Sequence, residues 1–211
     1  MTRLVIIRHA ESAFNLQNRI QGHMDSALSP KGRRQARRVG LRIKKMKLKI
    51  DKIFSSDLVR AWATTQEIAR HMRVPVVRDA RLREIFLGAW EGMTPEEVDE
   101  KYDKGYQRWL RSPSSCRIPG CETVARFRRR VTRRVRAIAR QNRGKTVLLV
   151  THGGVITALL ADWLKADFDN ILLNLQIDNT SLTLVDETET RVRLRTINDA
   201  THLSARDRSG H

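Results

Sequence analysis

The sequence predicts an α/β protein built on an open sheet, because two apolar runs each end in a histidine. Residues 4–7 are four consecutive apolar residues, three of them β-branched, that lead into Arg8-His9. Residues 146–150 repeat the arrangement ahead of Thr151-His152. Such runs are typical of buried strands, and ligands of open α/β sheets bind at the carboxyl ends of the strands. One histidine after a strand is most often a structural group, but two such histidines indicate a site.

The length and composition are those of an ordinary globular domain. The chain has 211 residues, of which 40% are hydrophobic, and it can bury a core without disulfide bonds or a structural metal. Neither a repeat nor a linker divides it, so residues 1–203 are expected to form a single domain. The polar residues 204–211 are expected to form a disordered tail.

The net charge is strongly positive. Lys and Arg number 41 against 23 Asp and Glu, which gives a formal net charge of +18. Such a surface attracts polyanions, including nucleic acid, acidic membranes and phosphorylated metabolites. The excess is spread along the whole chain, however, and an adaptation of solubility or environment explains it at least as well as a nucleic-acid partner.

Cysteine usage and hydropathy exclude several classes of protein. The two cysteines, Cys116 and Cys121, do not complete a four-ligand zinc site unless histidines lie nearby, and we expect free thiols. A Cys-x5-Arg phosphatase is excluded because Glu122 and Phe127 stand at the arginine positions. No apolar run approaches the ~20 residues that cross a bilayer, and no signal peptide is recognisable. We therefore expect a soluble, cytoplasmic protein without a membrane partner.

The first half of the chain predicts two helices and two further strands. Residues 16–28 show no period and are expected to form a loop, after which Ser29-Pro30 opens a helix as N-cap and first residue. Residues 50–54 form a short strand, and a helix over about residues 57–71 places Arg60 in its first turn. Residues 74–77 are typical of an edge strand interrupted by proline. Most arginines of so basic a chain face solvent, so Arg60 is a candidate only because it follows a strand.

A glutamate in an apolar loop is the next candidate for chemistry. Glu84 precedes an apolar stretch, residues 85–90, that would partly desolvate its carboxyl group and suit it to donating a proton. A salt bridge to one of the many arginines is the alternative. Thr94-Pro95-Glu96-Glu97 is a capping box. It predicts a helix of roughly four turns that ends before Pro113.

The second half of the chain predicts two more helices and a hairpin. An amphipathic helix from Glu122 to Gly144 carries many arginines and is the best nucleic-acid candidate. Basic helix faces are usually solvated, however, and no aromatic residues are interleaved here to stack bases. A helix from Gly153 through Leu164 has backbone N–H groups at its start that could receive an anion. Residues 179–185 and 191–197 alternate around an acidic turn and predict a β-hairpin.

Six blocks of the sequence resemble the histidine phosphatase superfamily, which includes the cofactor-dependent phosphoglycerate mutases. They occur in the family's order and are Arg8-His9-Ala10-Glu11 with Asn15, Arg19-x-Gln21-Gly22-x-x-Asp25, Leu28-Ser29-x-x-Gly32-x-x-Gln35-Ala36, Ser55-Ser56-Asp57-Leu58-x-Arg60-Ala61, Glu84 before Gly88-x-Trp90-Glu91-Gly92, and Thr151-His152-Gly153-Gly154. Ala10 stands where many members have glycine, and its methyl group is small enough for the turn. The resemblance implies a phosphoglycerate mutase-like fold, a three-layer α/β/α sandwich with a mostly parallel central sheet.

The resemblance also implies a role for each matching residue. His9 would attack phosphorus and form a phosphohistidine, while Glu84 would protonate the leaving alkoxide and then activate water. The phosphoryl oxygens would be held by Arg8, Asn15, Arg60, His152 and the backbone amide of Gly153. Guanidinium groups favour the neutral imidazole that attack requires and stabilise the charge of the transition state. The expected partner is a small phosphorylated substrate, and neither a metal nor a cofactor is expected.

Hydrolysis of phosphomonoesters is the expected reaction. Mutases of the family carry an extra basic segment between the acid glutamate and the second histidine, whereas here residues 88–94 pass directly into a capped helix, as in the phosphatase branch. The ending at residues 197–203 also resembles that branch. Phosphoglycerate mutase is the alternative.

The alcohol part of the substrate is left open by the sequence. Phosphoserine, α-ribazole phosphate and phosphorylated sugar acids are all compatible with it. The residues expected to contact this part are Gln21, Gly22, Leu87, Trp90, Arg108 and His202. A homodimer is compatible with a chain of this length. A different kind of function is the second alternative: a basic protein that binds nucleic acid or a membrane surface and keeps a vestigial site. The intact set of residues that match the family argues against this alternative.

Overall fold

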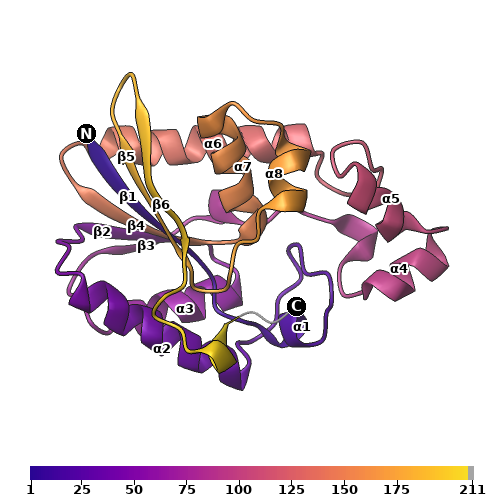
Figure 1. Ribbon diagram of the computed structural model, residues 1–211, viewed down its shortest axis with the longest axis horizontal. Coiled ribbons are helices and arrows are strands. Elements are labelled where there is room, and N and C mark those ends of the chain that lie inside the picture. Colours follow the sequence, from indigo (N-terminus) through magenta and orange to yellow (C-terminus); the bar gives the residue numbers. More distant parts are fainter. Residues whose placement is uncertain (209–211) are drawn as a thin grey trace.

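The computed structural model describes residues 1–208, and a six-stranded sheet forms its centre (Figure 1). The strands follow the order β3-β2-β4-β1-β5-β6. Their bounds are β1 Thr2–Arg8, β2 Lys52–Ser55, β3 Val76–Arg78, β4 Thr146–Thr151, β5 Leu182–Glu187 and β6 Val192–Asp199. The first four in the spatial order run parallel, while β5 pairs antiparallel with β1 and β6. The sheet is therefore mostly parallel, with the predicted edge strand and hairpin in place.

Helices cover both faces of the sheet and complete the three-layer sandwich implied by the family resemblance. They are α1 Ala13–Leu16, α2 Pro30–Lys45, α3 Val59–Ala69, α4 Pro95–Lys101, α5 Gly105–Arg111, α6 Val124–Gln141, α7 Gly153–Leu164 and α8 Phe168–Asn174. Figure 1 shows α2 and α3 on one side of the sheet and α6 and α7 on the other. Side chains of β1 alternate between the two faces. Val5 and Ile7 pack with Val39 of α2, whereas Leu4 and Ile6 pack with α6 and α7.

Local signals set the start of two helices that flank the site. Ser29 is the N-cap of α2 and accepts a hydrogen bond from the Gly32 amide at 2.9 Å, with Pro30 as the first residue, as predicted. The start of α7 follows β4 at once, because His152 is still extended and Gly153 is already helical. The helix therefore begins at the edge of the sheet where ligands bind.

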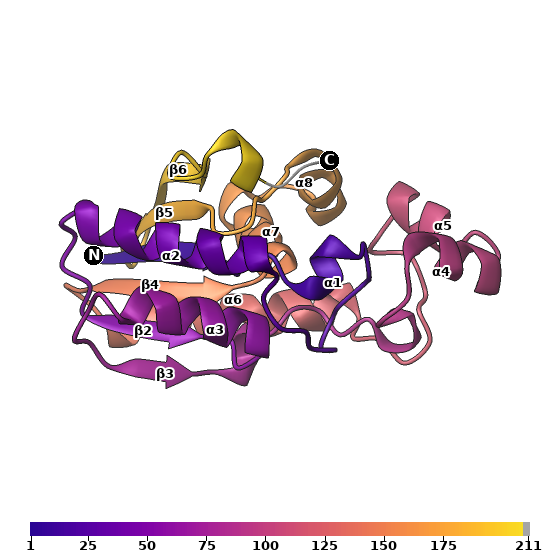
Figure 2. The ribbon, with the colours of Figure 1, turned by 90° about the horizontal axis from the view of Figure 1, so that it is seen from below.

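The segment predicted as one helix of four turns is two short helices, α4 and α5. Thr94 forms the predicted capping box of α4. After α4 the chain turns through Asp103 and Lys104, whose φ angles of +46° and +57° lie in the left-handed region. The Asp99 carboxylate accepts hydrogen bonds from two amides at the start of α5 and replaces the contacts that a continuous helix would make. The two helices form a lobe at one end of the molecule (Figure 2).

Five short elements of the described residues were not predicted from the sequence. They are α1, α8 and the 3-10 helices at Ala80–Leu82, Gly88–Trp90 and Ala205–Asp207. The Asp207 carboxylate is buried and forms ion pairs with Arg34 and Arg38 of α2. The expectation of a disordered tail is therefore wrong for residues 204–208, because these ion pairs attach the segment to α2. Residues 209–211 lie outside the described residues.

Two expectations from composition can be compared with the structure directly. Cys116 and Cys121 are free thiols, as expected, and they pack under the lobe against Trp90. Within the described part of the chain, none of the helices combines the length and the apolar character that crossing a membrane requires.

Candidate active site

The two histidines meet at the carboxyl ends of adjacent strands. Because β1 and β4 pair in parallel with Arg8 opposite Thr151, the next residues, His9 and His152, leave the sheet side by side. Their ring centroids lie 5.1 Å apart. Arg60 reaches the same place from α3, which follows β2, the other neighbour of β4. Groups distant in sequence converge here because parallel strands end at one edge of the sheet.

His9 is buried and is oriented by its neighbours. Its Nδ1 lies 2.7 Å from the Ala10 carbonyl oxygen, which assigns the ring proton to Nδ1 and leaves a lone pair on Nε2. Burial lowers the pKa of His9 well below its ordinary value, and the Arg60 and Arg8 guanidiniums lower this pKa further. The Asn179 side chain donates to the His9 carbonyl at 2.9 Å and holds the turn. A neutral imidazole with a free lone pair is the form that a nucleophile requires.

His152 carries its ring proton on the same nitrogen, Nδ1, but its hydrogen bond leaves that N–H group free. Its Nε2 lies 2.8 Å from Oγ of Ser56. With the Ser56 hydroxyl donating to Nε2, the ring proton resides on Nδ1. This buried Nδ1 has no hydrogen-bond partner among the described residues. Burial and the Arg60 guanidinium lower the pKa of His152 well below its ordinary value, so the ring is a neutral donor.

Arg8 and Arg60 bring two positive charges into the interior. Arg60 is only 1% exposed, and its guanidinium donates to the carbonyl oxygens of Gly22 at 2.8 Å and Met24 at 3.1 Å. Arg8 donates to the carbonyl oxygen of Ile177. The Nε atoms of both arginines are buried without a partner between residues 1 and 208. Buried N–H groups without a partner are destabilising, and together with the ring N–H of the second histidine they suit a phosphoryl dianion.

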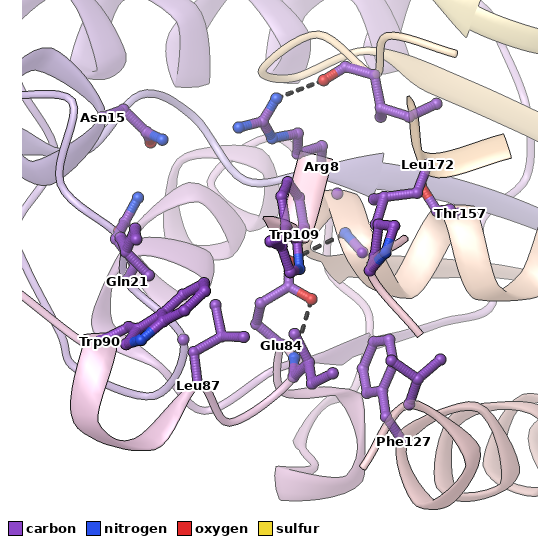
Figure 3. Close-up of a pocket in the computed structure, with 18 of the residues that line it drawn as sticks. Arg8, Asn15, Gln21, Glu84, Leu87, Trp90, Trp109, Phe127, Thr157 and Leu172 are labelled. Carbon is purple, nitrogen blue, oxygen red and sulfur yellow. Dashed lines mark hydrogen bonds between the residues drawn. The ribbon is translucent and has the colours of Figure 1, made fainter. Parts of the chain in front are cut away.

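Glu84 lies at the start of α7. Its Oε2 accepts a hydrogen bond from the Gly154 amide at 3.0 Å, and Oε1 accepts one from the Ile85 amide at 2.9 Å (Figure 3). A Cβ on Gly154 would lie 2.3 Å from Oε1, so a larger residue here would have to displace the carboxylate. The sequence predicted a carboxyl group surrounded by apolar side chains, whereas the structure gives it two backbone donors, as helix N-termini do.

Three residues that the sequence did not single out hold the site together. Glu91 accepts hydrogen bonds from three amides, those of His23 at 2.8 Å, Met24 at 2.9 Å and Leu87 at 2.9 Å, and so joins the loop before α2 to the Glu84 loop. Arg130 of α6 donates to the carbonyl oxygen of Glu84 at 3.0 Å. Ser56 orients His152. Glu91 and Ser56 stand inside the blocks of the family resemblance, whereas Arg130 is one arginine among many and no sequence signal distinguishes it.

A cavity of about 440 Å³ opens over these groups (Figure 3). Arg8, His9, Arg60 and Glu84 line it, while His152 is fully buried beside His9. The other expected phosphate-contacting or substrate-contacting residues in its wall are Asn15, Gln21, Gly22, Leu87, Trp90 and Gly153.

Two residues expected to contact the substrate are not brought to this cavity. Arg108 is exposed in the lobe, and its guanidinium donates to the carbonyl oxygens of Tyr102 and Asp103. His202 Nε2 lies 3.2 Å from Thr180 Oγ1, and burial lowers the pKa of His202 to about 4. The break between α4 and α5 and the packed C-terminal segment, neither of which was predicted, direct these side chains elsewhere.

Comparison with known proteins identifies relatives over nearly the whole chain. Residues 4–200 match the histidine phosphatase superfamily (branch 1). Phosphoserine phosphatase 1 of Hydrogenobacter thermophilus is 32% identical over 203 residues, which cover 96% of this chain and 95% of that protein. A broad-specificity phosphatase of Saccharomyces cerevisiae is 33% identical over 196 residues, 87% of this chain and 79% of that protein. The solved structure of Bacillus stearothermophilus YhfR has a TM-score of 0.89 at 30% identity, covering 96% of this chain and 99% of that one.

The matched range contains every group of the site. The two histidines, Arg60 and Glu84 all lie between residues 4 and 200. The similar proteins named above include phosphatases, and they support a phosphatase of the histidine phosphatase type. The chain therefore belongs to the histidine phosphatase superfamily.

Proposed function

We propose that the protein is a metal-independent phosphomonoesterase that transfers the phosphoryl group first to His9 and then to water. The observation that carries the proposal is the buried, neutral His9 ring, with its Nε2 lone pair free and the His152 donor beside it. Phosphoryl transfer needs a nucleophile with a lone pair and donors for the phosphoryl oxygens. This site offers both.

In the first step, Nε2 of His9 attacks phosphorus while the bond to the ester oxygen breaks. The products are a phosphohistidine and an alcohol, whose oxygen takes its proton from the Glu84 carboxyl group. Arg8, Arg60 and the ring N–H of His152 stabilise the charge on the equatorial oxygens. The amide at the start of α7 adds a backbone donor.

In the second step, water replaces the alcohol. The Glu84 carboxylate takes a proton from the water while its oxygen attacks phosphorus and the bond between phosphorus and nitrogen breaks. Inorganic phosphate leaves, and His9 regains its lone pair. The proton given to the alcohol is thus recovered from water, and the two amides that hold Glu84 keep the carboxyl group in one place for both steps.

A phosphoglycerate mutase would return the phosphoryl group to a second alcohol. We favour hydrolysis because the Glu84 loop leads directly into α4, and because α5 presents the rings of Tyr106 and Trp109 to the cavity, where a phosphoglycerate carboxylate would need cations. The assay that decides between them uses 3-phosphoglycerate with and without 2,3-bisphosphoglycerate. Formation of 2-phosphoglycerate faster than free phosphate would favour the mutase.

The test of the enzyme itself is phosphate release from p-nitrophenyl phosphate with EDTA present. We expect His9→Ala to lose at least about 10³-fold in kcat, and acid-labile phosphate to be trapped on the wild-type protein alone. His71→Ala, at an exposed histidine at the end of α3, is the matched control. Equal rates for wild type and His9→Ala would reject the enzyme. Steep salt-dependent binding to duplex DNA would then support the basic binding protein.

A further inference from the structure

We propose that the bond broken at this site joins phosphate to an apolar alcohol, and that the substrate is not an ester of serine, glycerate or a sugar. The inference rests on the proposed phosphatase function and names its substrate class. It comes from the side chains that line the cavity beyond the phosphoryl group.

Among the described residues, the cavity offers one cation outside the reactive centre, Arg19, and it is already paired. The acidic and basic residues of the lining are Arg8, His9, Arg19, Arg60 and Glu84. All of them except Arg19 belong to the reactive centre. Arg19 donates to the Gly92 carbonyl at 2.6 Å and to the Glu97 carboxylate at 3.1 Å. A carboxylate on the substrate would lose its water and would have to compete with Glu97 for Arg19, which opposes binding.

The rest of the wall is largely apolar and comes from several elements. Tyr106 and Trp109 of α5 stack with their ring centroids 5.6 Å apart, and both line the cavity. Leu87 of the Glu84 loop, Phe127 of α6 and Leu172 of α8 line the cavity as well. Figure 3 shows the side chains of Leu87, Trp109, Phe127 and Leu172 around the cavity. An alkyl or aryl group bound here would remove its own apolar surface and that of the wall from water.

Hydrogen bonds within the protein engage the side-chain oxygens that a polar alcohol would need. Gln21 Oε1 accepts a hydrogen bond from Ser12 Oγ at 2.8 Å. Asn15 Oδ1 accepts one from the Ser12 amide at 3.1 Å. A hydroxyl or ammonium donor on the substrate would have to share these two acceptors with Ser12.

A chain-length series of alkyl phosphates tests the inference. Ethyl, butyl and hexyl phosphate release alkoxides of similar basicity, so differences in kcat/KM report binding of the chain and not leaving-group chemistry. We expect kcat/KM to rise about fourfold for each methylene that enters the cavity. The kcat/KM values for hexyl and 2-phenylethyl phosphate should exceed those for O-phosphoserine and 3-phosphoglycerate by at least about tenfold.

Failure of the inference and failure of the proposed function give different results. A flat series, or faster turnover of O-phosphoserine or 3-phosphoglycerate than of hexyl phosphate, would overturn the apolar substrate class and leave the phosphatase intact. Absence of turnover of every ester, p-nitrophenyl phosphate included, would overturn both.

Two variants on separate helices assign the contact to the wall. Trp109→Ala and Leu172→Ala should each weaken the dependence of kcat/KM on chain length. They should lower kcat/KM for hexyl phosphate about tenfold more than for ethyl phosphate. Leu173→Ala is the matched control, because Leu173 is the next residue of α8, is 38% exposed and is not part of the wall. This variant should keep the increase of kcat/KM with chain length that the wild type shows. An unchanged increase of kcat/KM with chain length in both wall variants would overturn the assignment of the alkyl chain to this wall. Two variants on separate helices are used so that a folding defect in one does not decide the result.

Discussion

At the scale of single residues, the site depends on two imidazoles whose hydrogen bonds leave different ring nitrogens free. His9 directs its ring proton to the Ala10 carbonyl and keeps Nε2 free, whereas His152 accepts from Ser56 and keeps its proton on Nδ1. Burial, followed by the Arg60 guanidinium, lowers the pKa of both rings. One ring can therefore act as nucleophile and the other as donor, because a different neighbour fixes each.

Ser56→Ala tests the tautomer assigned to His152. Without the hydroxyl, nothing retains the ring proton on Nδ1, so we expect kcat for p-nitrophenyl phosphate to fall about tenfold or more. Loss of the buried hydrogen bond should also lower the free energy of unfolding by about 1 kcal/mol. Steady-state kinetics and urea unfolding measure the two effects, with Ser115→Ala at an exposed serine as control. Lower stability with unchanged kcat would make Ser56 a structural residue only.

At the scale of elements, two helices remote from the acid in sequence fix its position. The second residue of α7 donates to the Glu84 carboxylate, while Arg130 of α6 donates to the carbonyl oxygens of Arg83 and Glu84. Arg134, one turn further along α6, pairs with the buried Asp79. Two arginines of the helix predicted as a nucleic-acid candidate thus bind loops of the protein itself.

Gly154→Ala should displace the acid, because the added Cβ would lie 2.3 Å from Oε1 of Glu84. Loss of a general acid lowers the rate by about 10²-fold or more. We expect that loss for ethyl phosphate, whose alkoxide must be protonated, and a much smaller one for p-nitrophenyl phosphate, whose leaving group is a weak base. The two substrates are compared in the same variant. An equal loss for both would indicate general damage to the site.

Arg130→Gln should loosen the Glu84 loop. Removing the guanidinium leaves the partly buried carbonyl oxygens of Arg83 and Glu84 with fewer donors, so the free energy of unfolding should fall by about 2 kcal/mol, and kcat should fall with it. Arg129→Gln is the matched control, since Arg129 is the exposed neighbour on the same helix. It should change stability by less than about 0.5 kcal/mol. Urea unfolding and kinetics of both variants check this, and equal effects would contradict the role given to Arg130.

At the scale of the whole molecule, the buried histidines link folding to pH. The pKa values of His9 and His152 lie well below the ordinary value of 6.5, and burial lowers that of His202 to about 4. The unfolded chain takes up these protons near pH 6.5, at about the reference pKa of histidine, whereas the folded chain does not. Because the unfolded state then binds more protons, stability is full above about pH 7 and falls as the pH drops below 6.5. Depressed carboxyl pKa values, such as that of Asp57, act at lower pH.

The free energy of unfolding should therefore decrease between pH 7.5 and pH 5.5. Each fully buried histidine contributes at most about 1.4 kcal/mol of this decrease at pH 5.5. His202→Gln should remove about 1 kcal/mol of it, a smaller share because the ring is partly exposed. Urea titrations at the two pH values measure the difference, with His71→Gln as control. The same pH dependence in wild type and His202→Gln would contradict the assigned pKa.

The sequence by itself determined the strands, the helix caps and the position of each reactive group along the chain. Buried strands such as residues 4–7 and caps such as Ser29 depend on a few neighbouring residues, so a local pattern is enough to predict them. Placing His9 and His152 after two strands then put both at the ligand-binding edge of the sheet, which agrees with their ring separation of 5.1 Å.

The tertiary structure alone decided which side chains from distant parts of the chain contact each other. Asp207 contacts Arg34, Arg130 contacts the Glu84 loop, and Trp109 and Leu172 line the same cavity only because separate elements pack together in space. It also decided that the lobe has two helices and that Arg108 turns away from the site. The physical reason is that the energy of such contacts depends on distances between groups far apart in sequence, for which no local pattern of residues carries a signal.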